Sequence, residues 1–176
     1  MIKHDVVVVG GGLSGLRAAI AAHDGGLNAA VLTQVYPVRS HSGAAQGGIN
    51  AALANAEGAK DDTPDRHAYD TVKGSDYLGD QDAIEVMCSE AASDIYELEK
   101  MGAVFSRDAD GNIAQRPFGG AGYPRTCYLA DRTGHALLHV MYEQLLKYSI
   151  ALYDEWQVIR LVKNNDAICG VIAIEL

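Results

Sequence analysis

A valine-rich strand that runs into a glycine-rich turn constrains the fold of this chain more than any other feature. The β-branched run over residues 5–9 is typical of a strand buried on both faces of a parallel sheet. Gly10, Gly12 and Gly15 follow it at the spacing Gly-x-Gly-x-x-Gly, and an amphipathic helix is expected over 13–23. Gly10 permits a tight turn, Gly12 lets backbone N–H groups approach a diphosphate, and Gly15 lets the helix pack on the strand. The sequence therefore predicts a diphosphate site at the helix N-terminus.

Apolar periodicity and turn residues predict the remaining elements. After Gly25-Gly26 we expect a strand over 29–33, an irregular crossing over 34–48 and a short helix that begins within 49–53. A polar region with a loop follows over 55–80, and then a helix that is capped by Asp80 or Asp82 and stopped by Gly102. The last expected elements are a hairpin at Asp110-Gly111, a helix over 133–148, and antiparallel strands over 156–162 and 169–174. This order indicates an α/β fold, a Rossmann-like parallel sheet with helical and antiparallel β additions. No linker divides residues 1–176, so we expect no internal domain boundary.

Charge and composition exclude several classes of function. The 176 residues carry a formal net charge of −9, which disfavours nucleic-acid binding because phosphate neutralisation needs a basic face. No apolar run is long enough to span a membrane, and the first strand begins too early to leave room for a targeting peptide. The three cysteines lie far apart, which is typical of a reducing compartment. His135 and His139 have helical spacing but no third ligand, so we expect no metal site.

The end of the second strand argues against a nicotinamide cofactor. Thr33 and Gln34 stand where an Asp or Glu would hold the ribose hydroxyls. A hydroxyl and an amide can bond a ribose, but without the stronger hydrogen bond that a charge provides. FAD remains compatible, because its flavin half supplies much of the binding surface.

His41 lies among small residues about two dozen positions after the glycine turn. A lone histidine is more often structural or exposed, but serine, glycine and alanine neighbours let an aromatic ring system lie against the backbone. The imidazole can attack the methyl group on the benzenoid edge of an isoalloxazine. Gly47 and Gly48 would turn main-chain N–H groups toward the opposite edge, where the reduced flavin is anionic. The segment therefore predicts a flavin joined covalently to His41.

At this point the chain resembles a known family over nearly all of its length. The matching stretches, in the same order, are residues 8–19, 39–42, 45–49, 69–76 with 79–82, 115–120 and 130–135. They are similar to the N-terminal part of the flavoprotein subunit of succinate dehydrogenase and fumarate reductase. The resemblance implies an FAD-binding parallel sheet that belongs to a larger flavoprotein of electron transport and the tricarboxylic acid cycle.

The resemblance also implies a role for individual residues. Gly10, Gly12 and Gly15 would hold the FAD diphosphate and Thr33 would lie near the ribose. Ser40, His41 and Ser42 would line the flavin with His41 as the covalent attachment, Ala45, Gln46, Gly47 and Gly48 would follow its ring, and Val158 would touch the adenine. Phe118 and Gly47 would form a wall of the dicarboxylate site. Two features depart from the family: Gln34 replaces a frequent lysine, and the loop 121–125 is short.

The implied activity is interconversion of succinate and fumarate by hydride transfer to covalent FAD, with electrons passing through an iron–sulfur subunit to quinone. Membrane-anchor subunits would hold the complex on the cytoplasmic side of the inner membrane of a bacterial or archaeal cell. In this family the proton-transferring arginine and the groups that grip the substrate carboxylates come from beyond residue 176, so no catalytic residue is assigned here and the isolated chain is predicted to be inactive. Two alternatives stay open: a flavoenzyme like L-aspartate oxidase, whose family lacks a histidine at position 41, and a non-catalytic FAD-binding fragment.

Overall fold

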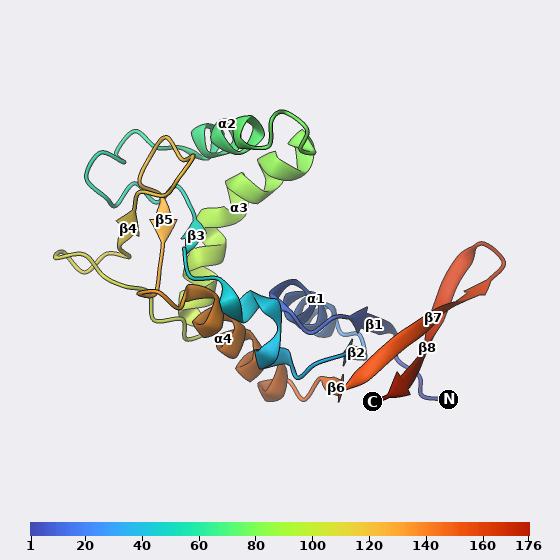
Figure 1. Cartoon of the computed structure of the whole chain (residues 1–176). Coiled ribbons are helices and arrows are strands. Elements are labelled where there is room, and N and C mark those ends of the chain that lie inside the picture. The colour runs from blue at the N-terminus through green and yellow to red at the C-terminus, as the bar shows by residue number, and fades with distance from the viewer. The chain divides into compact units, whose positions relative to one another are not determined.

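Three parallel strands form the sheet of one of two compact units in the computed structural model, which describes all 176 residues (Figure 1). This first unit comprises residues 1–44 and 137–176. Its strands are β1 (Val6–Val9), β2 (Ala29–Thr33) and β6 (Ala151–Asp154), in the order β1-β2-β6. The helix α1 (Leu13–Asp24) connects β1 to β2, which confirms the predicted strand–helix–strand unit. The sequence pattern did not predict β6.

The expectation that the first strand is buried on both faces is wrong. Val7 and Val9 are 36% and 56% exposed, whereas every residue of β2 is buried. The reason is that β1 lies at the edge of the sheet and α1 covers one face, on which Val8 packs close to Gly15. Because side chains alternate along a strand, Val7 and Val9 point to the opposite face.

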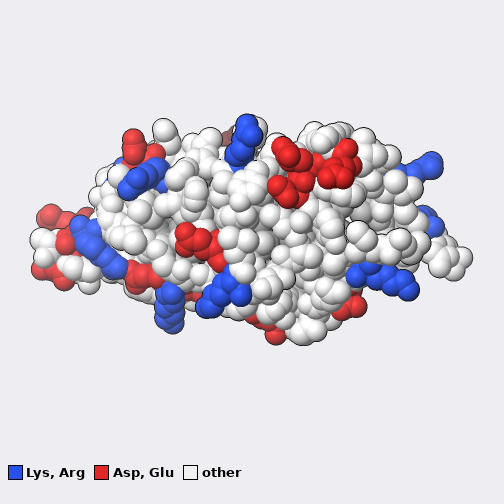
Figure 2. Space-filling model, turned by 90° about the horizontal axis from the view of Figure 1, so that it is seen from below, with Lys and Arg blue, Asp and Glu red and all other residues white.

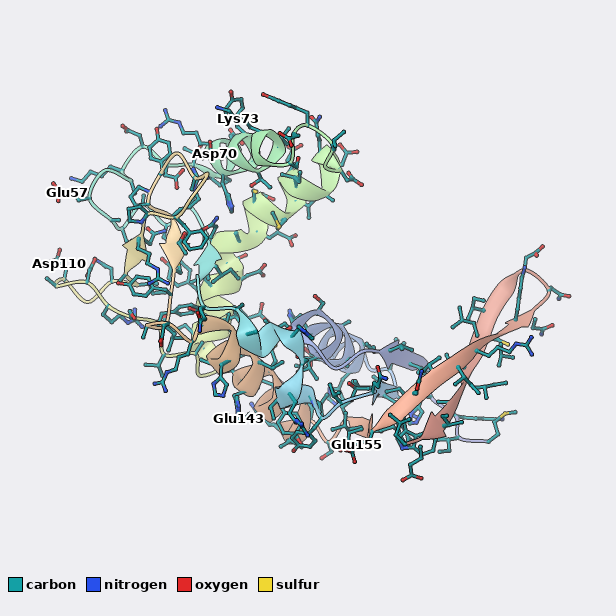
Figure 3. All side chains as sticks on the ribbon, viewed as in Figure 1. Glu57, Asp70, Lys73, Asp110, Glu143 and Glu155 are labelled. Atoms are coloured by element: carbon teal, nitrogen blue, oxygen red, sulfur yellow. The ribbon has the colours of Figure 1, made fainter.

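The crossing after β2 contains two short 3-10 helices, Pro37–Arg39 and His41–Ala44, as expected of an irregular segment. Later in the chain α4 (Thr133–Lys147) confirms the predicted helix, and its buried side chains are Thr133, Leu137, Leu138, Val140, Met141 and Leu145. The predicted antiparallel strands are also present, as β7 (Trp156–Asn164) and β8 (Ala167–Glu175). Glu155, at a φ of +59°, makes the corner between β6 and β7 (Figure 3).

The second unit comprises residues 45–136. Its small antiparallel sheet has the order β3-β5-β4, from β3 (Ile49–Asn50), β4 (Gln115–Arg116) and β5 (Thr126–Cys127). Two helices, α2 (Pro64–Gly74) and α3 (Gln81–Lys100), complete the unit. Asp80 caps α3 by accepting a hydrogen bond from Ala83 N, and Gly102 follows its end at a φ of +116°, as the sequence predicts.

The short helix expected within 49–53 is absent, because Ile49 and Asn50 form a strand instead. Their backbone pairs with Cys127 and Thr126, and the Thr126 hydroxyl donates to Asn50 Oδ1 at 2.6 Å. The alanines that follow favour a helix locally, but pairing with a strand far away in the sequence outweighs that preference.

The polar region 55–80 contains a helix that the sequence analysis missed. Pro64 opens α2, and the hydroxyl of Thr63 accepts a hydrogen bond from Arg66 N. Thr63-Pro64-Asp65 is thus a helix-start signal, hidden because α2 is polar on most sides and buries only His67. The expected hairpin at Asp110-Gly111 is reduced to one bridge, between Arg107 and Ile113, and Asp110 lies at its tip (Figure 3).

The negative charge of the chain is not gathered into one patch on the face drawn in Figure 2. Acidic side chains stand at separate places on this face, with basic side chains and uncharged surface between them. None of the helices combines the length and the apolar character that crossing a membrane requires.

Candidate functional site

The turn after β1 is closed by contact between two of its glycines. Gly10, at a φ of +117°, donates from its N–H to Leu32 O at 2.8 Å. A Cβ atom placed on Gly15 would lie 1.9 Å from Gly10 O, so any larger residue would force the backbone to shift. The Gly-x-Gly-x-x-Gly pattern therefore has the steric basis that the sequence analysis assumed: it lets α1 begin directly against the strand.

Two serine hydroxyls face this turn from the segment after β2. Ser42 Oγ accepts a hydrogen bond from Leu13 N at 3.3 Å. A Cβ atom on Gly12 would lie 3.2 Å from Ser42 Oγ and 3.8 Å from Ser40 Oγ. Ser40 Oγ is buried and has no hydrogen-bond partner. An unpaired buried hydroxyl beside the N-terminus of a helix is suited to an anionic group such as a diphosphate, so these residues fit the cofactor that the motif implies.

Thr33 is buried at the end of β2, and its hydroxyl is already engaged. It donates to Val35 O at 2.8 Å, and its side chain packs so closely over Gly11 that a Cβ there would lie 2.9 Å from Thr33 Oγ1. Only the hydroxyl lone pairs remain to accept a bond from a ribose. Gln34, beside it, is exposed.

His41 begins the second 3-10 helix and is exposed, so its imidazole is accessible for reaction. This 3-10 turn is held by a hydrogen bond from Gly43 N to Ser40 O at 3.0 Å.

Val158, the predicted adenine contact, is half-buried in β7 opposite Ala173 and adjoins a bulge in that strand pair. The assignment of these residues to FAD stays a prediction.

In the second unit Gly47 and Phe118 are brought into direct contact. A Cβ on Gly47 would lie 2.7 Å from Phe118 Cζ, while the ring itself is 53% exposed. Gly48 has a φ of +124°, and a Cβ there would lie 2.5 Å from Cys127 O. Gln46 is exposed, and Ala45 O accepts a hydrogen bond from Gly134 N at 2.8 Å. The pairing of Gly47 with Phe118 agrees with a shared wall for a small ligand.

Arg116 links this segment to the small sheet, and the sequence analysis did not assign it a role. Its Nη2 donates to Gly47 O at 2.6 Å and to Gln46 O at 3.2 Å. Its guanidinium lies 4.3 Å from the centroid of the Tyr128 ring, within the range of a cation–π contact. The sequence feature that could have indicated a role for Arg116 is its position between Gln115 and Pro117, in one of the stretches that match the family.

A second arginine, Arg125, is fully buried in a charged cluster. It donates two hydrogen bonds to Asp62, at 2.9 and 2.7 Å, and one to Asp70 on α2, at 2.9 Å (Figure 3). Burial alone would lower the pKa of Arg125, but the bonds and charges of Asp62 and Asp70 outweigh it and raise that pKa. Asp70 also accepts from Gly122 N at 2.8 Å, so the cluster ties α2 to the loop that follows Phe118.

A buried thiol, that of Cys127, lies two residues after Arg125. Cys127 is fully buried, and burial raises its pKa to about 12. A thiol that stays protonated is neither a nucleophile nor a metal ligand, which agrees with its interpretation as a structural cysteine.

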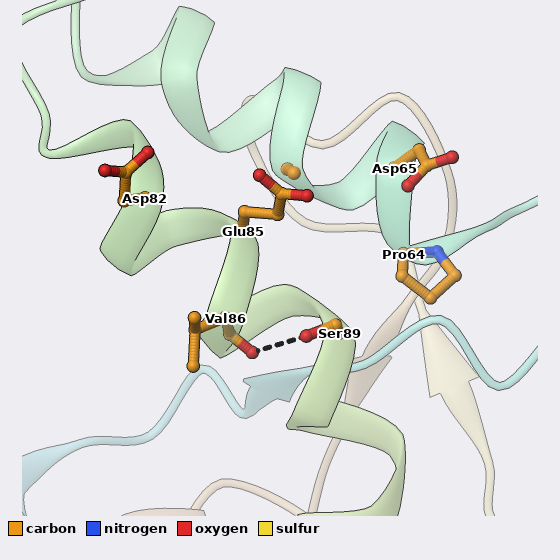
Figure 4. Close-up of a pocket in the computed structure, with 7 residues that line it drawn as sticks. Pro64, Asp65, Asp82, Glu85, Val86 and Ser89 are labelled. Carbon is orange, nitrogen blue, oxygen red and sulfur yellow. Dashed lines mark hydrogen bonds between the residues drawn. The ribbon is translucent and has the colours of Figure 1, made fainter.

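A cavity of about 330 Å³ lies between α2 and α3 (Figure 4). Its lining includes three carboxylates and a serine whose hydroxyl bonds within its own helix. None of the cofactor or substrate residues predicted from the sequence lines it; the residues that do are Pro64, Asp65, Ala68, Asp82, Glu85, Val86 and Ser89. The cavity is therefore separate from the candidate site.

Comparisons with known proteins identify the family and the fold of this chain. The family described as FAD binding domain matches residues 5–176. The succinate dehydrogenase flavoprotein subunit of Rickettsia bellii is 51% identical over 99% of this chain, and the fumarate reductase flavoprotein subunit of Mycobacterium tuberculosis is 45% identical. The structure of E. coli quinol fumarate reductase FrdA superposes with a TM-score of 0.91 at 34% identity, over 99% of this chain and 29% of that one.

These matches confirm the predicted resemblance and the α/β fold class of a larger flavoprotein. The chain spans about 30% of the length of the curated relatives it matches.

Proposed function

Because this chain belongs to the FAD binding domain family, we propose that it forms part of a flavoprotein subunit that interconverts succinate and fumarate. The observation that carries the proposal is the turn at Gly10–Gly15 with the buried, unpartnered hydroxyl of Ser40 beside it. This arrangement calls for an anionic group at the start of α1. Relatives named for succinate dehydrogenase and fumarate reductase supply the substrate class.

Residues of the first unit would hold the dinucleotide. Backbone N–H groups at Gly12 and the start of α1 would bind the diphosphate, with Ser40 and Ser42 beside them. Thr33 would accept from the ribose, Val158 would touch the adenine, and His41 would form the covalent bond to the ring. The chemistry that FAD would supply when bound is a hydride acceptor, its N5 atom, for the hydride that leaves the dicarboxylate.

Residues of the second unit would contact the ring and the substrate. Ala45, Gln46, Gly47 and Gly48 would follow the isoalloxazine. Phe118 offers an exposed apolar face beside Gly47, suited to the methylene groups of a dicarboxylate. We assign no proton-transfer group to these residues, and we expect the isolated chain to lack succinate turnover.

The proposal extends to partners and location. Electrons would leave through an iron–sulfur subunit to quinone, and membrane-anchor subunits would hold the complex at the cytoplasmic side of the inner membrane. Residues 1–176 would act together as part of one FAD-binding domain.

Acid precipitation of the holoprotein tests the covalent bond at His41. We expect the yellow colour to stay with the precipitate of the unmutated protein and to be released from His41→Ser. His4→Ser serves as the control because His4 bonds Asn28 and Tyr153 and has no role in the site. Release of the colour from the unmutated protein would contradict the proposal and favour a flavoenzyme like L-aspartate oxidase.

A further inference from the structure

Arg116 keeps an uncompensated positive charge beside the segment 46–48. Its Nη2 donates to two backbone carbonyls, and no carboxylate pairs with it. Its Nε–H is buried and has no hydrogen-bond partner. Arg125 in the same unit is different, because Asp62 and Asp70 neutralise it. Arg116 is half-buried, so its charge is partly shielded from water, and a negative charge from outside the protein would stabilise it.

The two carbonyls bound by Arg116 connect it to two free N–H groups. The carbonyl of Gln46 shares a peptide unit with Gly47 N–H, and the carbonyl of Gly47 shares one with Gly48 N–H. Neither N–H donates a hydrogen bond to another backbone group. A cation bound to a carbonyl polarises the whole peptide unit and makes its N–H a stronger donor.

Glycine at both positions leaves these N–H groups without a side chain of their own beside them. The Phe118 ring occupies the place of a Cβ at Gly47, and Gly48 adopts a φ of +124°. Hence the backbone at 47–48 presents two polarised donors with no side chain of its own to cover them. Such a pair suits an acceptor that gains negative charge during a reaction.

We propose that Arg116 raises the reduction potential of the bound FAD by strengthening the Gly47 and Gly48 donors toward the reduced ring. This inference rests on the proposed function, in which succinate gives up a hydride and a proton to become fumarate. The hydride adds two electrons and one proton to the neutral oxidised ring, which then carries one negative charge. Arg116 would act through the carbonyls of Gln46 and Gly47, so it is a positioning residue, and its effect is on the relative stability of the reduced form.

The test is a spectroelectrochemical titration of FAD in the holoprotein and in two variants. Arg116→Gln keeps a donor for the carbonyls but removes the charge, and Arg116→Lys keeps the charge. We expect Arg116→Gln to destabilise the reduced form of the attached FAD about tenfold relative to the oxidised form, which lowers the reduction potential by about 30 mV for a two-electron couple. Arg116→Lys should retain most of the potential, and Arg107→Gln, which removes an exposed arginine paired with Glu99, should leave it unchanged.

Three results would overturn the inference. One is an unchanged potential in Arg116→Gln, with or without a higher KM for fumarate. Another is an equal fall in Arg116→Lys, since charge would then not be the cause. The third is loss of FAD from Arg116→Gln, which would make the arginine a residue of cofactor retention. If the unmutated protein were purified without flavin, the proposed function itself would be contradicted. A charge-dependent potential in a protein without succinate turnover would contradict only the proposed substrate.

Discussion

Two regions of the molecule carry the candidate residues, and they are built by different means. The turn at Gly10–Gly15 is made of backbone, and its geometry follows from glycine contacts a few residues apart. The second region, here called the charge-held region, lies in the second unit, where two-residue strands pair with one another. There Arg116 bonds the carbonyls of Gln46 and Gly47, and the buried Arg125 bonds Asp62 and Asp70. The glycine turn therefore depends on the absence of side chains, whereas the charge-held region depends on buried charge.

The largest expected effect is in the charge-held region. Arg125→Met would leave Asp62 buried without its cation, which costs about 3–5 kcal/mol of folding free energy. Urea unfolding measures it. Arg107→Met, which removes the half-exposed pair with Glu99, is the matched control and should cost about 1 kcal/mol or less.

A double variant sharpens the same point. Arg125→Met combined with Asp62→Leu removes both charges of the bidentate pair, so it should be more stable than Arg125→Met alone. If the double variant were less stable than the single one, buried charge would not be what holds this region.

A smaller effect is expected in the backbone-made turn. Gly15→Ala places a Cβ 1.9 Å from Gly10 O, and the forced backbone shift should cost about 1–3 kcal/mol together with most of the bound flavin. Gly74→Ala is the control, because its Cβ would meet open space at the end of α2. Unchanged flavin content in Gly15→Ala, measured by absorbance, would break the contrast between the regions.

The contrast also explains what the sequence could predict. Residues 6–33 were assigned correctly because each signal is local: valines for the strand, glycines for the turn, and Gly25-Gly26 for the helix end. β3, β4, β5 and β6 were not, because two to four residues become a strand only through pairing with residues far away in the sequence, such as Asn50 with Thr126 or Leu152 with Val31. The exposure of one face of β1 could not be predicted either. The alternation of side chains along a strand shows which residues share a face, but not whether another element covers that face.

The candidate site divides in the same way. The glycines and serines near α1 could be chosen from spacing and composition. Arg116 and Arg125 could not, because a basic residue in a polar stretch is usually exposed and only the fold reveals its carbonyl or carboxylate partners.

The smallest expected effect is a pH dependence in the charge-held region. His67 is buried on α2, and burial, followed by the charge of Arg125, lowers its pKa, while Asp62 and Asp70 oppose the shift. The unfolded chain therefore binds the proton more tightly, so stability should fall as pH drops below about 6.5. His67→Gln should lose part of this dependence in urea titrations at pH 7 and pH 5.5, and an unchanged slope would show that the imidazole is not involved.

The central claim is that FAD lies with its diphosphate at the turn and its ring joined to His41. Trypsin should release residues 40–60 as one peptide, because it cleaves after Arg39 and after Lys60 and no other Lys or Arg lies between them. Mass spectrometry of the holoprotein digest should find this peptide heavier by the mass of FAD less two hydrogens, because the new bond replaces one hydrogen of the imidazole and one of the flavin methyl group. An unmodified 40–60 peptide from a protein that is purified without flavin would contradict the account.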